Sequence, residues 1–208
     1  MKLLIFGATG TVGKQLILQS VAMGHEVTAF ARYTEKLNDF GHKNLNIFKG
    51  DVLDASAVEK AVKGHDAVFC TLGAGRKGDV RAKGTLNIIR AMEKTGVKRF
   101  ICQSTLGVGD SKGNLNFFWK YFMFGFFLKE AYRDHELQEK YIAQSNLDWT
   151  IVRPGAFTGG NISGNYKHGF SPTEKKLELK ISRSDVALFM LMQLTSGEYI
   201  RKTPGLSY

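Results

Sequence analysis

A glycine-rich turn between an apolar run and a helix pattern constrains this chain most. Residues 2–6, KLLIF, have the length and composition of a buried strand. GATGTVG follows directly and places Gly7, Gly10 and Gly13 at the mouth of a helix predicted over 11–23. Glycines there allow a tight turn, close approach of the backbone to a ligand, and close packing of helix on strand. Because the first N–H groups of a helix are unpaired, the unit is predicted to bind phosphate.

The first 154 residues repeat this alternation of strand and helix. The predicted strands are 2–6, 26–31, 45–49, 66–72, 99–104 and 149–154, and the predicted helices are 11–23, 54–63, 79–95 and 128–145. Short, continuous apolar strands are typical of a sheet covered on both faces. We therefore expect an α/β fold with a Rossmann-type, doubly wound, mostly parallel sheet. Asp54 is expected to cap the second helix and Gly96 to end the third.

The pattern changes after Pro154. A glycine-rich polar stretch is followed by a strand predicted over 176–182 and a capped apolar helix beginning near Ser184. No linker or repeat separates this part from the rest. We expect a single domain over residues 1–208, in which about 155–208 forms a small pocket-forming region on the substrate side.

Composition excludes several classes of protein. The chain of 208 residues has 43% hydrophobic and 23% charged residues, which is typical of a globular protein. Its net charge of +10 can attract the phosphates and carboxylates of small molecules, and no long basic run favours nucleic acid. Cys70 and Cys102 lie in apolar runs and are predicted to be buried, reduced thiols. Metal-ligand spacing is absent, and with no targeting segment we expect a cytoplasmic protein.

The residue after the second predicted strand indicates which dinucleotide is used. Folds that prefer NAD usually carry an acidic residue there, which binds the ribose hydroxyls. This chain has Arg32, with Lys36 nearby. A guanidinium can donate two parallel hydrogen bonds to a 2′-phosphate, which amounts to about a ten- to over a hundredfold preference for NADPH over NADH. Arg32 therefore predicts NADPH as the cofactor.

The G-x-x-G-x-x-G spacing resembles that of the short-chain dehydrogenase/reductase superfamily, particularly its extended and atypical members. The resemblance implies that Asp51 and Val52 lie beside the adenine and that Leu72, Gly73 and Ala74 pass the ribose and diphosphate. Arg76 or Lys77 either closes on phosphate or is solvated. The residues expected to bind the cofactor are Gly7, Thr9, Gly10, Thr11, Val12, Gly13, Arg32, Asp51, Val52, Leu72, Gly73, Ser104, Pro154, Gly155, Ala156 and Phe157.

The catalytic residues of that superfamily are only partly present. ICQST places Ser104 after the fifth strand, with Thr105 beside it. The usual Tyr-x-x-x-Lys pair, which protonates an alkoxide, is missing: its positions fall on Ala131 and His135. A conjugated acceptor such as a flavin or linear tetrapyrrole delocalises incoming charge and needs less help from an acid.

Longer segments resemble the atypical reductases of the biliverdin reductase B, or NADPH-dependent flavin reductase, group. These segments are IFGATGTVG, GDVLDASAVEKAVKGHDAVFCTLG, GTLNIIRAMEKTGVKRFICQST, SNLDWTIVRPG and ISRSDVALFML. The resemblance implies a monomer that binds NADPH and passes hydride to flavins and some tetrapyrroles. Ser104 would lie near the nicotinamide and His135 at the pocket edge. A second histidine of the group is replaced here by Ala156 or Phe157. The RPG segment also occurs in NmrA-like regulators and assembly factors, which bind the dinucleotide and need not catalyse.

Residues 117–128 hold eight of the chain's 24 aromatic residues. Three interpretations remain open: packing against the sheet or a second subunit, an aromatic wall that stacks on a planar acceptor, or peripheral membrane attachment. The stretch is too short to span a bilayer. Phe117, Trp119, Phe122 and Thr105 are the expected substrate contacts.

The sequence therefore predicts an NADPH-dependent reductase, a monomer or weak homo-oligomer, acting on FMN, riboflavin or biliverdin. Flavin is expected as a substrate rather than a bound group. The alternative is a catalytically idle NADPH-binding regulator or assembly factor that holds a protein partner through residues 117–128. A sugar-nucleotide epimerase is disfavoured by the missing Tyr-x-x-x-Lys pair.

Overall fold

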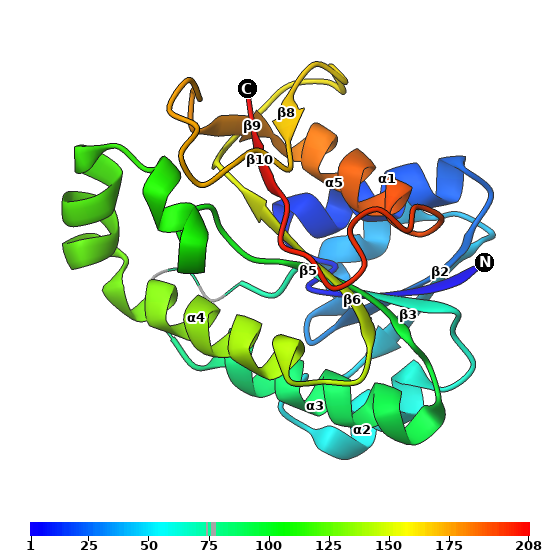
Figure 1. The fold of residues 1–208 in the computed structure, drawn as a ribbon. Coiled ribbons are helices and arrows are strands. Elements are labelled where there is room, and N and C mark those ends of the chain that lie inside the picture. Colours follow the sequence, from blue (N-terminus) through cyan, green and yellow to red (C-terminus); the bar gives the residue numbers. More distant parts are fainter. Residues whose placement is uncertain (74, 76–77) are drawn as a thin grey trace.

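An eight-stranded, mostly parallel sheet forms the centre of the computed structural model, which describes residues 1–73, 75 and 78–208 (Figure 1). Its strands, in spatial order, are β3 (Leu45–Lys49), β2 (Glu26–Ala31), β1 (Lys2–Phe6), β4 (Ala67–Cys70), β5 (Arg99–Gln103), β6 (Asp148–Pro154), β10 (Gly205–Ser207) and β8 (Lys167–His168). β8 and β10 pair antiparallel, whereas the other pairs of this sheet are parallel. The strand order reverses beside β1, which leaves a crevice at the carboxyl ends of β1 and β4.

Helices cover both faces of the sheet. The helices are α1 (Thr11–Ala22), α2 (Ala55–Val62), α3 (Val80–Thr95), α4 (Lys129–Ala143) and α5 (Arg183–Met192). α1 and α5 pack together on one face, and α2, α3 and α4 lie side by side on the other (Figure 1). Each face buries its own apolar cluster, so the β1, β4 and β5 strands are apolar at nearly every position. The predicted fold class is confirmed.

Local signals set several element ends as predicted. Asp54 Oδ1 accepts hydrogen bonds from the N–H groups of Ser56 (2.9 Å) and Ala57 (3.2 Å) at the start of α2. Gly96 ends α3 in the left-handed conformation, with a φ of 80°. Cys70 and Cys102 are buried free thiols on neighbouring strands.

Other element ends were predicted wrongly. The strand expected over 66–72 is limited to Ala67–Cys70, and the one expected over 176–182 is limited to β9 (Lys180–Ser182). Leu179 has a φ of 57°, which interrupts the extended backbone just before β9. The start of α5, in contrast, agrees with the prediction of a capped helix beginning near Ser184: α5 begins at Arg183, and Oγ of the N-cap residue Ser182 accepts from the Asp185 N–H at 3.0 Å.

Three very short strands after β6, namely β7 (Ala156–Thr158), β8 and β10, were not predicted from the sequence. β7 pairs with β9 in a separate two-stranded sheet, while β8 and β10 extend the main sheet beyond β6. Strands of two or three residues are too short to show a period in the sequence. Two 3-10 segments, η1 (Thr34–Phe40) and η2 (Gly109–Asn114), lie between the longer elements.

The aromatic stretch folds as a π-helix, η3 (Phe118–Phe127), and none of its residues is buried. Two of its residues, Trp119 and Phe124, are half-buried against the small apolar cluster of Leu106, Leu115 and Leu179, so only this part of the stretch packs on the rest of the chain. None of the helices found in the described part of the chain has the length and apolar character needed to cross a membrane.

Candidate functional site

A cavity of about 630 Å³ opens at the carboxyl ends of the central strands. Most residues that the sequence predicts for a site line it: Gly7, Thr9, Gly10, Thr11, Val12, Arg32, Val52, Leu72, Gly73, Ser104, Thr105, Trp119, His135, Pro154, Gly155, Ala156 and Phe157. The cavity thus extends from the glycine turn to η3. Its volume lies within the range of small-molecule and cofactor sites.

The glycine turn is packed too tightly for side chains. Gly7 has a φ of 79°, and a Cβ on it would lie 2.4 Å from the Thr71 carbonyl oxygen. A Cβ on Gly13 would lie 2.3 Å from the Gly7 carbonyl oxygen. Gly13 is not among the lining residues, so its role is the close approach of α1 to the turn. Gly10 gives α1 no side-chain cap, which leaves the first N–H groups of α1 available to an anion.

The charge of the lining also suits a phosphate group. Arg32, Arg81 and Arg183 are among the described lining residues, and no carboxylate is. Arg32 is about half exposed and lies 3.8 Å from Asp51, between Nη1 and Oδ2. Asp51 itself does not line the cavity, because its Oδ1 accepts from the Leu53 N–H at 2.9 Å. The donor set therefore fits a dinucleotide with phosphates at both the glycine turn and Arg32.

Arg183 is a lining residue that the sequence reading missed. Its Nε donates to Thr11 Oγ1 at 3.0 Å, and its guanidinium lies 5.6 Å from the centre of the Phe157 ring. Arg183 thereby connects the first turn of α1 with β7. The sequence does show a basic residue directly after the capping Ser182, but it does not indicate that this side chain points into the cavity.

Arg81, at the cavity wall, is held by an acidic residue of α4. Asp134 accepts from the backbone N–H groups of Arg81 (3.1 Å) and Ala82 (3.0 Å), and from Arg81 Nη1 at 3.4 Å. Asp134 therefore caps the N-terminus of α3 from a neighbouring helix. This contact fixes α3 and α4 relative to each other at the point where His135 enters the cavity.

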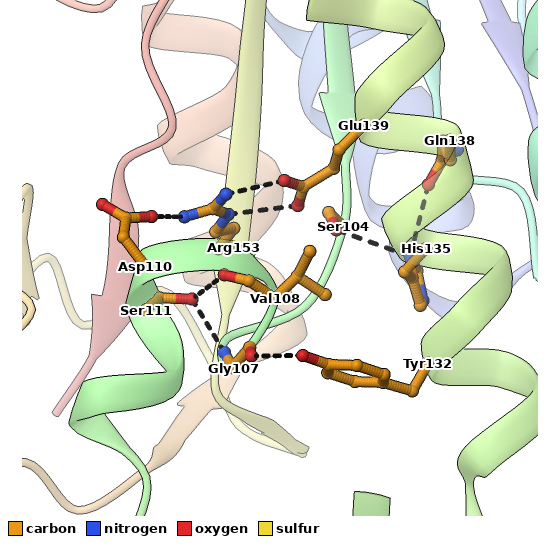
Figure 2. A network of polar contacts seen from close by, with 10 residues as sticks. All are labelled: Ser104, Gly107, Val108, Asp110, Ser111, Tyr132, His135, Gln138, Glu139 and Arg153. Carbon is orange, nitrogen blue, oxygen red and sulfur yellow. Dashed lines mark hydrogen bonds and ion pairs between the residues drawn. The ribbon is translucent and has the colours of Figure 1, made fainter.

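Ser104 and His135, which both line the cavity, point toward one another (Figure 2). Ser104 Oγ lies 3.5 Å from His135 Nδ1, which is at the long limit of a hydrogen bond. His135 Nδ1 is 3.2 Å from Gln138 Oε1, and Gln138 Nε2 donates to Thr85 Oγ1 at 2.9 Å. Since Gln138 presents its oxygen to the ring, we assign the hydrogen to Nδ1. The Ser104 hydroxyl is then free to donate its hydrogen into the cavity.

His135 is neutral at neutral pH. Burial lowers its pKa to about 3, and the nearby charge of Arg81 lowers it further, while the hydrogen bond with Gln138 opposes the shift. A group with this pKa holds no proton to give at pH 7. His135 therefore suits positioning of Ser104 better than acid catalysis.

Tyr132 does not replace the missing catalytic tyrosine. Its hydroxyl donates to the Gly107 carbonyl oxygen at 3.1 Å, and it is not among the cavity-lining residues (Figure 2). Burial raises the pKa of Tyr132 to about 12, with a further contribution from Glu136. The positions of the usual pair, Ala131 and His135, carry no phenol or amine.

Trp119 and Phe124 are the aromatic residues of η3 that line the cavity, in addition to Phe30 and Phe157 from other elements. Phe117 and Phe122, which were expected there, do not line the cavity and are 78% and 50% exposed. In a π-helix, residues five apart share a face, so Trp119 and Phe124 point together while Phe122 and Phe127 point elsewhere. Ala74, Arg76 and Lys77, also expected at the site, lie outside the described residues. Within the described ranges, no group of three His, Cys, Asp or Glu side chains could hold a metal ion.

Residues 7–197 match a family described as NAD(P)H-binding. This match covers most of the chain and includes the glycine turn, Ser104, His135 and Arg183. The chain belongs to this family. The expectation of an NAD(P)-binding, oxidoreductase-like fold is therefore confirmed.

Relatives of this NAD(P)H-binding protein have diverse names. UPF0659 protein YMR090W of Saccharomyces cerevisiae is 33% identical over 93% of this chain and 87% of its own length. Photosystem II assembly factor Ycf39 of Synechocystis is 28% identical over 80% of this chain, which spans only 48% of Ycf39.

Solved structures share the whole fold. ChuY of Escherichia coli O157:H7, described as an anaerobilin reductase, has a TM-score of 0.83 and 25% identity, with 100% of this chain and 97% of ChuY covered. The oxidoreductase ylbE of Lactococcus lactis has a TM-score of 0.82 and 27% identity, with 100% and 90% covered. The NAD(P)H-binding fold of this chain is thus that of known oxidoreductases.

Proposed function

We propose that this protein is an NADPH-dependent reductase of a planar, conjugated acceptor, either a flavin such as FMN or riboflavin or a linear tetrapyrrole such as biliverdin. The observation that carries the proposal is the single cavity that joins the glycine turn, Ser104 and an aromatic wall at Trp119 and Phe124. The similarity to ChuY supports a tetrapyrrole, because that protein is described as an anaerobilin reductase.

Different residues along the cavity bind the cofactor, orient the reacting groups and bind the acceptor. The N–H groups at the start of α1 bind the diphosphate, and Arg32 binds the 2′-phosphate, which selects NADPH over NADH. Bound NADPH supplies the hydride. Ser104 donates a hydrogen bond that orients the reacting groups, and Trp119 and Phe124 stack on the flat acceptor. Catalysis comes mainly from proximity and orientation.

No side chain of the described wall is well suited to give a proton at neutral pH. His135 is neutral, and Tyr132 is bonded to a carbonyl outside the cavity. A simple ketone would leave an alkoxide that needs a strong local acid, whereas a conjugated ring delocalises the charge and can take a proton from water. The wall therefore favours flavins and tetrapyrroles over simple carbonyl compounds.

The test is steady-state oxidation of NADPH and NADH by the purified protein, with FMN, riboflavin and biliverdin as acceptors. We expect turnover with NADPH and a loss of about tenfold or more in kcat/KM for Arg32→Ala with NADPH but little loss with NADH. Arg90→Ala is the matched control, because Arg90 is an exposed arginine of α3 that does not line the cavity. Tight binding of NADPH without reduction of any acceptor would contradict the reductase proposal.

That contrary result would support a catalytically idle NADPH-binding assembly factor or regulator. The similarity to Ycf39, described as an assembly factor, favours this second candidate. In that case the cavity binds the dinucleotide without catalysis, and the protein acts by holding a protein partner.

A further inference from the structure

The outer side of η3 carries an unusual surface. Six aromatic side chains between residues 117 and 127 are exposed: Phe117 (78%), Phe118 (53%), Tyr121 (57%), Phe122 (50%), Phe126 (75%) and Phe127 (39%). We call these six residues the aromatic face. They pack mainly on each other, as in the ring pairs Phe117–Tyr121 at 4.8 Å and Phe122–Phe127 at 4.9 Å. Monomeric proteins rarely expose so continuous an apolar surface without a partner.

The charges around the aromatic face are positive. Residues 111–129 contain Lys112, Lys120 and Lys129 but no Asp or Glu. The acidic residues that flank this segment are both paired with arginine: Asp110 with Arg153, and Glu130 with Arg133 at 3.7 Å. Among the residues that the structure describes, no ion pair is formed by Lys112, Lys120 or Lys129, and all three are close in sequence to the exposed rings.

We propose that the aromatic face docks this protein on the surface of an anionic lipid bilayer. Aromatic rings bury well at the boundary between headgroups and acyl chains, and lysines beside them attract anionic headgroups. A symmetric contact with a second copy fits less well, because it would bring the lysines of both copies together with no carboxylate in the segment to pair them. The net charge of +10 adds a long-range attraction to the same surface.

The geometry of η3 links docking to the cavity. Trp119 and Phe124 line the cavity, while the aromatic face lies on the other residues of the same helix. A bilayer held by the aromatic face would therefore contact the element that forms one wall of the site. This inference does not depend on turnover and holds for either candidate function.

The test is co-sedimentation of the full chain with vesicles of phosphatidylcholine alone and of phosphatidylcholine mixed with phosphatidylglycerol. We expect binding to the anionic vesicles, weaker binding to the neutral ones, and a decline with added salt. Replacing the two most exposed rings, in Phe117→Ser/Phe126→Ser, should lower the partition coefficient by about tenfold or more. Replacing charge, in Lys112→Gln/Lys120→Gln, should lower it by about fivefold per lysine.

The matched control is Leu18→Ser/Met192→Ser, which removes two exposed apolar side chains on α1 and α5, away from η3. Thermal unfolding of each variant shows whether it is folded. The proposal is overturned if the chain does not prefer anionic vesicles, or if the ring variant binds them as the control does. It is also overturned if wild-type chain forms a dimer that the ring variant cannot form, since a second copy would then cover the face.

Discussion

His135 is buried in the cavity wall with its ring nitrogen against Gln138. Its pKa of about 3 in the folded chain compares with 6.5 for a free histidine. At a pH between these two values, His135 binds a proton in the unfolded chain but not in the folded chain. Stability from this residue is therefore fully present above about pH 6.5 and is lost as the pH falls toward 3.

The expected loss is about 2 kcal/mol of unfolding free energy between pH 8 and pH 5. Urea unfolding of the wild type and of His135→Asn at both pH values measures it, because the other groups titrate in both proteins. The variant should lose less stability on acidification than the wild type. A pH dependence that is equal in the wild type and in His135→Asn would mean that His135 binds a proton in the folded chain as readily as in the unfolded chain.

At the scale of single elements, α3 approaches the site through a glycine. A Cβ on Gly84 would lie 2.8 Å from Val52 Cγ1 and 3.0 Å from Leu72 Cδ1, and both of these residues line the cavity. Gly84→Ala should therefore destabilise the chain by about 1–3 kcal/mol despite the better helix propensity of alanine. It should also weaken NADPH binding, because Val52 and Leu72 must move.

Urea unfolding and a fluorescence titration with NADPH check the two parts of this prediction. Gly125→Ala is the control, since a Cβ there would meet only the Lys120 carbonyl oxygen at an ordinary 3.7 Å. A Gly84→Ala variant more stable than wild type would show that α3 shifts away without cost.

Elements differ in how far the sequence could predict them. β1, β2 and β4 were predictable because burial on both faces makes them nearly continuous apolar runs. β3 was also predicted to be a buried strand, but it lies at the edge of the sheet and its residues are half-buried or exposed. Ser104 was placed correctly on the cavity wall because it directly follows such a run. The π-helix was not predictable, because a change in backbone hydrogen bonding from a spacing of four residues to a spacing of five brings Phe124 instead of Phe122 to the wall. Arg183 was missed because its partner Thr11 lies 172 residues away in the sequence.

At the scale of the whole molecule, one arginine joins three separate parts of the chain. Arg153 of β6 donates to both carboxylate oxygens of Glu139 in α4, at 3.0 Å and 2.6 Å, and also to Asp110 in η2 (Figure 2). The side chains of Arg153 and Glu139 are only 6% and 10% exposed, whereas Asp110 is 65% exposed. The buried pair therefore holds β6 and α4 together next to Ser104.

Removing one member of the buried pair should be costly. Arg153→Met leaves the Glu139 carboxylate buried without its partner, which we expect to cost about 3–5 kcal/mol in urea unfolding. Arg153→Met/Glu139→Leu removes both charges and should lose less than the single variant. Asp110→Asn, at the exposed end, should cost less than about 1 kcal/mol. The single variant Glu139→Leu completes the double-mutant cycle. If the double variant loses the sum of the Arg153→Met and Glu139→Leu losses, the two side chains are not coupled as the structure implies.

The position of β10 has a consequence for synthesis. β10 lies between β6 and β8, with Gly205 beside Arg153 and Leu206 opposite His168. As a ribosome makes the chain from its N-terminus, β8 emerges long before β10 and has no sheet neighbour until β10 follows. The half of the sheet that holds the glycine turn can assemble early on the nascent chain, whereas the half beyond β6 must wait for the last residues of β10 to leave the exit tunnel.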